Sequence, residues 1–284
     1  MALKHVVGLD HVVILVRDLD RAAETWRRLG FTLAPRGTHS AHMGTANHTV
    51  MLGPDYVELI GVVAETDYNA PSRGLLERRG EGIERAALAT DDAAAGVEEI
   101  RARGLDGTGP LNFGRPVTLP DGSRTEARFK VFHWPLDEAP AGLRIFACQH
   151  LTRDAVWIPE LQRHANGAKH IVRVEITSED PQGDAAHMAR LLDEPAESGP
   201  DGALSVRPGG GRAAFVFLTR DALSRRYPGV SLEGLPPGAA SLVLATDDID
   251  AAARALRSAA VRSGDKVCVP PAAANGVLLV FERG

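Results

Sequence analysis

Two stretches of the chain have the same sequence, Leu88-Ala89-Thr90-Asp91-Asp92 and Leu244-Ala245-Thr246-Asp247-Asp248. Each ends an apolar strand with an acidic turn, and each leads into a helical segment, at 93–104 and 249–260. The same order recurs with other letters at Leu15-Val16-Arg17-Asp18-Leu19-Asp20 and at Ile176-Thr177-Ser178-Glu179-Asp180. Internal repeats constrain a fold more tightly than any single motif, so the chain is predicted to consist of duplicated modules.

The first copy shows what a whole module contains. Residues 9–16 are almost continuously apolar, which is typical of a strand covered on both faces. Asp18 is well placed to cap the helix that follows, because its carboxylate can accept from the first free N–H groups. Three further strands are predicted at 31–36, 45–52 and 56–62. The resulting order is strand–helix–strand–strand–strand.

Four such modules, the last two less regular, pair into two halves. We place the halves at 1–151 and 169–284, joined by a crossing segment at 152–168 that is rich in polar and turn-forming residues. The prediction is therefore an α+β protein of repeated βαβββ modules, whose curved mixed sheets enclose a cleft.

The composition restricts the partners and the location. The 284 residues are 44% hydrophobic and 24% charged, as in ordinary soluble proteins, and the net charge of −5 without a basic stripe argues against nucleic acid. Residues 1–10 lack the apolar run of a signal peptide, and no stretch has the length of a membrane span. Cys148 and Cys268 read as isolated thiols of a reducing compartment. We expect a cytoplasmic protein without membrane contact, and a homodimer.

The module order resembles that of a known superfamily. Gly8-Leu9-Asp10-His11-Val12-Val13 and Tyr56-Val57-Glu58-Leu59 look like the vicinal oxygen chelate superfamily of glyoxalases, extradiol dioxygenases and resistance proteins. Within it, three strings resemble a glyoxalase-like domain group of mostly unassigned activity: Gly44-Thr45-Ala46-Asn47, Phe146-Ala147-Cys148-Gln149-His150 and His164-Ala165-Asn166-Gly167-Ala168. The resemblance implies the fold but no particular substrate, because this fold hosts many chemistries.

His11 and Glu58 are the first candidates for a metal site. Both interrupt apolar strands, where a buried imidazole needs a partner and a buried carboxylate must be neutralised, paired or bound to a cation. From the residues alone, a structural hydrogen bond for His11 and a salt bridge for Glu58 remain open. The resemblance implies metal ligands, because the superfamily places ligands on the first and last strands of a module.

The third ligand is harder to assign. Alignment on the helix starts gives Arg85, Arg173 and Ser241 as the equivalents of His11, and none of these is a usual metal ligand. His150, at the end of the second module's last strand, is the best substitute, although it could equally bond to the crossing segment. Two histidines and a carboxylate suit divalent iron, manganese, nickel or zinc.

The remaining candidates concern the substrate. His48 and Glu58 are candidate catalytic residues, with His48 as a possible base, and Asn47 is a candidate substrate-binding residue. Arg85 and Arg173 suit a carboxylate or phosphate if they project into the cleft. His164 and Asn166 could orient a substrate or simply fix the turn between the halves. The remaining histidines are expected to be solvated, among them His5, His39, His42, His133 and His187.

These observations predict a metal-dependent enzyme of the vicinal oxygen chelate type that acts on a small oxygenated substrate by lyase, isomerase or dioxygenase chemistry. The alternatives are a metal-free protein of the same fold that binds or sequesters a small molecule, and a scaffold whose clefts are filled by side chains.

Overall fold

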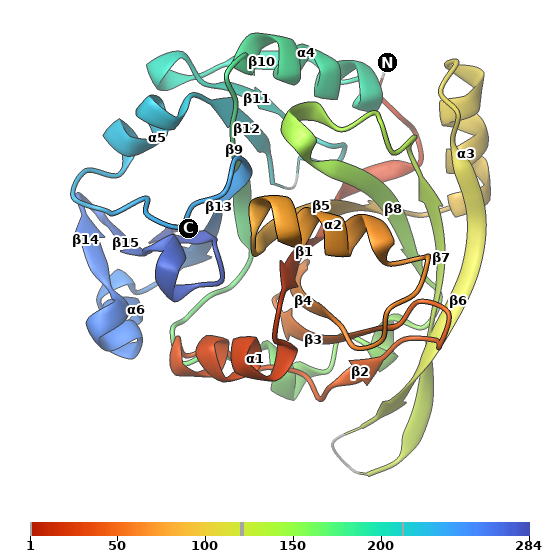
Figure 1. The fold of residues 1–284 in the computed structure, drawn as a ribbon, viewed down its shortest axis with the longest axis horizontal. Helices are drawn as coiled ribbons and strands as arrows, with labels where there is room; N and C mark the ends of the chain where they lie inside the picture. The colour runs from red at the N-terminus through yellow and green to blue at the C-terminus, as the bar shows by residue number, and fades with distance from the viewer. Residues whose placement is uncertain (1, 120–121, 212) are drawn as a thin grey trace.

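A computed structural model of the protein describes residues 2–119, 122–211 and 213–284. The strands in this part of the chain form two eight-stranded sheets, one from each half (Figure 1). The first has the order β2 (Gly37–Thr38), β3 (Thr45–Met51), β4 (Tyr56–Val62), β1 (Val6–Val16), β5 (Gly82–Thr90), β8 (Arg144–His150), β7 (Arg124–His133) and β6 (Thr108–Thr118). The second has the order β10 (Ala196–Ser198), β11 (Leu204–Val206), β12 (Phe215–Leu218), β9 (Ile171–Thr177), β13 (Gly238–Thr246), β16 (Leu278–Arg283), β15 (Lys266–Val269) and β14 (Val261–Ser263).

The strand pairing has the same pattern in all four modules. The first strand of each module lies parallel to its last strand, as in the pairs β1–β4, β5–β8, β9–β12 and β13–β16. In the middle of each sheet the first strands of two modules pair antiparallel, β1 with β5 and β9 with β13. Parallel strands need a long crossover, and the helix with two intervening strands supplies it. The predicted α+β fold of repeated βαβββ modules with curved mixed sheets is confirmed.

The acidic turns cap the helices as the sequence predicts. The capping residues of α1 (Leu19–Arg28), α3 (Ala93–Ala102), α4 (Pro181–Leu192) and α6 (Ile249–Leu256) are Asp18, Asp92, Asp180 and Asp248. Each carboxylate accepts from backbone N–H groups of the first turn, which have no partner within the helix. The repeat does not predict α2 (Ala70–Arg79) or α5 (Arg220–Arg226), which follow the last strands of the first and third modules.

Residues 31–36 do not form the predicted strand. Phe31 is buried and its ring lies 5.0 Å from that of Trp26, so this segment serves the core under α1. Pro35 has no N–H to donate to a ladder, and Ala34 alone of this segment bonds β3 through its N–H, to Thr49. The edge strand is therefore only β2, residues 37–38.

A β-bulge changes the faces of β1. Leu9 pairs with Leu88 of β5 and His11 with the next residue, Ala87, so Asp10 is an extra residue. In a regular strand Leu9 and His11 would share a face. The bulge instead directs Leu9 into the core with Val12 and Ile14, and it leaves Asp10 and His11 in contact.

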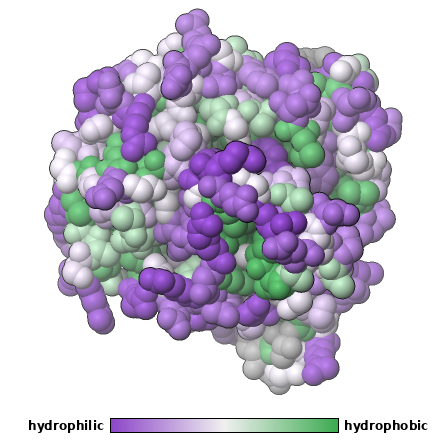
Figure 2. All heavy atoms as spheres, in the orientation of Figure 1, coloured by the Kyte–Doolittle hydropathy of each residue, from purple (hydrophilic) through white to green (hydrophobic). Residues whose placement is uncertain are grey.

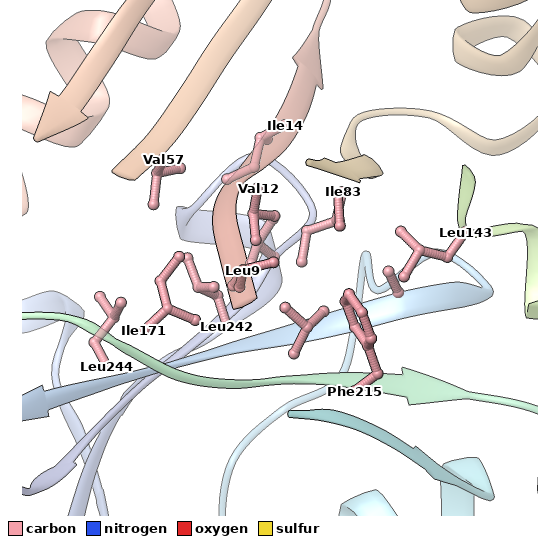
Figure 3. Packing of buried hydrophobic residues seen from close by; sticks show 14 of the residues in the cluster. Leu9, Val12, Ile14, Val57, Ile83, Leu143, Ile171, Phe215, Leu242 and Leu244 are labelled. Atoms are coloured by element: carbon pink, nitrogen blue, oxygen red, sulfur yellow. The ribbon is translucent and has the colours of Figure 1, made fainter. Parts of the chain in front are cut away.

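The two halves share one hydrophobic core. Leu9, Val12 and Ile14 of β1 belong to the same buried cluster as Ile171 of β9 and Leu242 of β13 (Figure 3). The two sheets therefore bury apolar side chains in one common core. The boundaries at 151 and 169 as limits of separate domains stay a prediction, because the core crosses them.

No helix in the described ranges is long and apolar enough to cross a membrane.

Candidate functional site

The first sheet curls around a cavity of about 280 Å³. One wall comes from β1, β3 and β4, which contribute His11, Asn47 and Glu58. The other comes from β5 to β8, including Arg85 and a set of apolar residues, Phe113, Phe129, Val131 and Phe146. Figure 2 shows hydrophobic residues in a hollow near the centre of the side that faces the viewer, bordered by hydrophilic residues.

Asp10 orients His11 from behind the cavity. Asp10 Oδ2 lies 2.6 Å from His11 Nδ1 and 3.0 Å from His150 Nε2. Burial alone would raise the pKa of Asp10, but His150 and His11 outweigh burial and hold it well below the usual range of a carboxyl group. The ionised Asp10 can only accept, so His11 donates through Nδ1, and a neutral His11 would offer the lone pair of Nε2 to a cation. This Nε2 lies 3.7 Å from Glu58 Oε2, on the cavity side.

Glu58 is a carboxylate that faces two imidazoles. Asn47 Nδ2 donates to its Oε1 at 2.6 Å, and His39 Nε2 lies 3.8 Å from the same oxygen. Burial would raise the pKa of Glu58, but His11 and His39 together with the Asn47 hydrogen bond lower it. Glu58 is therefore ionised at neutral pH.

His39 was expected to be solvated, and this expectation is wrong. Its side chain is only 9% exposed, and Nδ1 lies 2.7 Å from Thr45 Oγ1. Burial lowers its pKa, and the positive charges of Arg115 and Arg85 add to that effect against the attraction of Glu58. A neutral imidazole can offer Nε2 to a cation when Nδ1–H donates to Thr45.

The donor set at the cavity fits a divalent metal ion. His11 Nε2, His39 Nε2 and Glu58 supply two nitrogens and a carboxylate, the ligand types that iron, nickel, manganese and zinc accept. A carboxylate behind His11 is the usual outer partner of a metal-bound histidine.

Among the described residues, the group whose donor atoms all have the spacing of metal ligands is a different one, formed by Asp10, Cys148 and His150. Its donor atoms lie within 4.8 Å of one another. Asp10 and His150 already bond each other, however, and burial raises the pKa of the Cys148 thiol well above its usual value. A cation there would displace existing hydrogen bonds, so we favour the set that faces the cavity.

His150 as the third metal ligand stays a prediction; it belongs to the group with Asp10 and Cys148 and not to the set at the cavity. Its Nε2 is used by Asp10, and it is not among the residues that line the cavity. Its Nδ1 is buried without a partner among the described residues. The structure gives His150 the position of a residue that supports Asp10.

His48 lies on the opposite face of β3 from Asn47, as the alternation of the strand predicts, and outside the cavity. Its Nδ1 lies 2.9 Å from the carbonyl oxygen of Ala34. The proposed role as a catalytic base has no support in this position, because the ring does not face the site.

His164 and Asn166 fix the crossing segment. His164 Nδ1 accepts from the N–H of Thr32 at 3.0 Å, and Nε2 lies 2.9 Å from the carbonyl oxygen of Met51. Asn166 is fully buried and donates to the carbonyl oxygen of Leu29. Of the two roles considered for these residues, the structure places them in the turn and away from the cavity.

Arg173 lies in the second half, where the equivalent cleft is filled. Its guanidinium bonds Glu282 and Glu175, with Nη1 2.7 Å from Glu282 Oε1. Tyr227, which follows α5, donates to Glu175 at 2.9 Å and packs with Leu223 against Val243, the counterpart of Val13. Arg173 thus stabilises a packed interior, and we do not assign it to a ligand.

Besides His39, sequence reasoning missed two histidines of the cavity, His42 and His133. The pKa of His133 falls from 6.5 to about 4, first through burial and then through Arg85. One sequence signal was available: His39 and His42 occupy one short loop between strands that line the cleft.

Comparison with solved structures supports the fold. A hypothetical protein from Staphylococcus aureus has a TM-score of 0.68 at 13% identity, over 97% of this chain and 99% of that one. A mutant of 4-hydroxymandelate synthase from Streptomyces coelicolor has a TM-score of 0.61 at 15% identity, over 99% and 94%. A fusion of a xylose isomerase-like TIM barrel with 4-hydroxyphenylpyruvate dioxygenase has 0.61 at 12% identity, over 100% of this chain and 50% of that one.

A search among curated proteins finds no match. The family model of the glyoxalase-like domain matches residues 9–192, which is more than half of the chain and includes the whole cavity. The chain therefore belongs to the glyoxalase-like domain family of the vicinal oxygen chelate superfamily, as its sequence motifs predict.

Proposed function

We propose that the protein is a metal-dependent enzyme that acts on a small oxygenated substrate in the cavity of its first half. The observation that carries this proposal is the convergence of His11 Nε2, His39 Nε2 and Glu58 on the cavity, with Asp10 fixing the proton of His11. A divalent ion held there would polarise a substrate oxygen and stabilise negative charge on it.

The protein's own groups would prepare the reaction. Asn47 holds Glu58 in place through its 2.6 Å hydrogen bond, and the apolar wall excludes water from the bound substrate. We assign proton transfer to His133 in place of His48. The side chain of His133 lines the cavity and has no hydrogen-bond partner in the described ranges. Burial and, after it, Arg85 lower the pKa of His133, so an anion bound at Arg85 would offset part of this shift.

The second half would support the first. The place of His11 is taken by Arg173 and Ser241 there, and the interior is packed. The proposal therefore has one active centre in each chain. The homodimer and the cytoplasmic location stay predictions.

The test is the metal content of protein purified without chelator, measured by mass spectrometry. Wild type is expected to carry about one divalent ion per chain, whereas His11→Ala and Glu58→Gln are expected to lose it. His5→Ala is the control, because this histidine pairs with Asp91 on the surface. Wild-type protein that neither contains metal nor gains thermal stability from Mn²⁺, Fe²⁺, Ni²⁺ or Zn²⁺ would contradict the proposal and leave the metal-free binding protein.

A further inference from the structure

Arg85 occupies the same place in the second module as His11 in the first. The two residues stand equally far before the capping residues Asp92 and Asp18. The strand β5 also carries a bulge, because Val13 pairs with Arg85 and the next residue, Ile14, with Ile83. The extra residue there is Glu84, the counterpart of Asp10.

The two bulges hold their neighbours in the same way. Asp10 bonds His11, and Glu84 Oε2 accepts from Arg85 Nε and Nη2 at 3.0 and 2.8 Å. Glu84 is fully buried, and its other oxygen accepts from Ser72 at 2.7 Å and from Arg144. A carboxylate held by this many donors is a rigid support for the guanidinium of Arg85. The first bulge thus presents an imidazole nitrogen to the cavity, and the second presents a guanidinium.

The positive charge in the cavity exceeds the negative. Arg85 and Arg115 both line it, and Arg115 forms no ion pair among the described residues. Glu58 is the one carboxylate in the described lining, and Glu84 behind the wall pairs with both Arg85 and Arg144. The two arginines outnumber Glu58 on the lining itself, which favours an anionic ligand. Arg85 Nη1 has no hydrogen-bond partner in the described part of the chain, so it is free to bind that charge.

Much of the remaining lining is apolar. The rings of Phe113 and Phe129 stack with centroids 5.1 Å apart, and Phe146 lies on the wall next to Arg85. A ligand that fits both features has a charged end and an apolar body.

We propose that the substrate is a carboxylic acid with an apolar or aromatic body, and that Arg85, positioned by Glu84, binds its carboxylate. This inference rests on the proposed function, because it takes the same cavity as the substrate site. An oxygen on the carbon next to the carboxylate would then lie toward His11 and Glu58.

The test compares two probes of equal size by calorimetry, 3-phenyllactate and its uncharged amide, 3-phenyllactamide. Wild-type protein is expected to bind the acid more tightly than the amide. Arg85→Met is expected to weaken binding of the acid at least about tenfold and to leave the amide unchanged. Arg144→Met is the matched control, because Arg144 bonds the same Glu84 but does not line the cavity; it should keep the preference for the acid.

Arg85→Lys is a second variant in case Arg85→Met does not fold. Lysine keeps the positive charge but lacks the paired N–H donors of a guanidinium. The preference of this variant for the acid should lie between those of wild type and Arg85→Met. Equal binding of acid and amide by wild type, no binding of the acid, or an unchanged preference in Arg85→Met would each overturn the inference.

All titrations are run on chelator-treated and metal-loaded protein. A protein that prefers the acid but never takes up metal would overturn the proposed function and leave this inference standing. A protein that takes up metal but ignores the charge of the probe would do the reverse.

Discussion

The imidazole of His11 lies flat on the ring of Tyr56, with the ring centroids 4.2 Å apart and the planes at 19°. Asp10 bonds the edge of the same imidazole, so one face and one nitrogen of His11 are fixed. The two residues are neighbours because β1 and β4 pair in parallel with His11 opposite Tyr56. His11 Nε2 is thereby left to face Glu58 and the cavity.

Asp10→Asn is expected to lower the metal affinity about 10- to 100-fold. The asparagine amide can donate to His11 Nδ1, which would move the imidazole proton to Nε2 and block the lone pair that faces Glu58. A competitive chelator titration measures the affinity. Asp91→Asn, which alters the surface pair with His5, serves as the control and should leave the affinity unchanged. Equal affinities of Asp10→Asn and wild type would show that Asp10 does not set the state of His11.

His39→Ala is expected to reduce metal loading strongly, because it removes the second imidazole beside Glu58. His42→Ala is the matched comparison, since His42 lies in the same loop and lines the cavity but its Nδ1 bonds Ser40. Loading is read by mass spectrometry of purified protein. A full metal complement in His39→Ala would return the third ligand to His150 or Cys148.

Leu242→Ala is expected to lower the free energy of unfolding by about 2–5 kcal/mol, because it opens a cavity in a fully buried position of the shared core. Since that core joins both halves, urea unfolding of the variant should keep one transition by fluorescence and by circular dichroism. Leu136→Ala, at a leucine that is 66% exposed, should cost far less. Two separate transitions in wild type would mean that the halves unfold independently.

Stability is expected to fall as the pH decreases from 6.5 to 4. Burial, assisted by Arg85, lowers the pKa of folded His133 to about 4, while the unfolded chain takes up the proton near 6.5. Between these values the unfolded state binds more protons, so protonation favours unfolding. The pKa values of His39, His48 and His164 are lowered as well and act in the same direction.

Thermal melting between pH 7 and 4 checks this dependence with His133→Gln, which should lose less stability than wild type over that range. His5→Gln, at a surface histidine, should follow wild type. Parallel curves for wild type and His133→Gln would contradict the role given to His133.

The fold could be predicted from the sequence largely because of local signals. Asp18, Asp92, Asp180 and Asp248 act through the first turn of their own helices, and an apolar run such as 9–16 needs no distant partner to be recognised. The strand prediction for residues 31–36 failed because their apolar side chains pack into the core beneath α1. Periodicity alone cannot distinguish such a buried loop from a strand.

The candidate site was less predictable because its key relations are between strands. A bulge is visible only in the pairing of two strands, so neither Asp10 nor Glu84 stood out in the sequence. His39 reaches Glu58 because the β2–β3 hairpin folds its loop over β4. His11 and Glu58 could be found, since a polar residue in an apolar strand is a local anomaly.

The second half contains a packed counterpart of the site in the first half. Tyr227 and Leu223 are fully buried there and belong to one apolar cluster with Val243. A substitution at Ser241 or Arg173 should therefore change the stability of the protein. A substitution at His11 or Arg85 should change the binding of the metal ion or the ligand. Under the proposed function, the second copy would serve stability alone, and the first would serve both the shared core and the site.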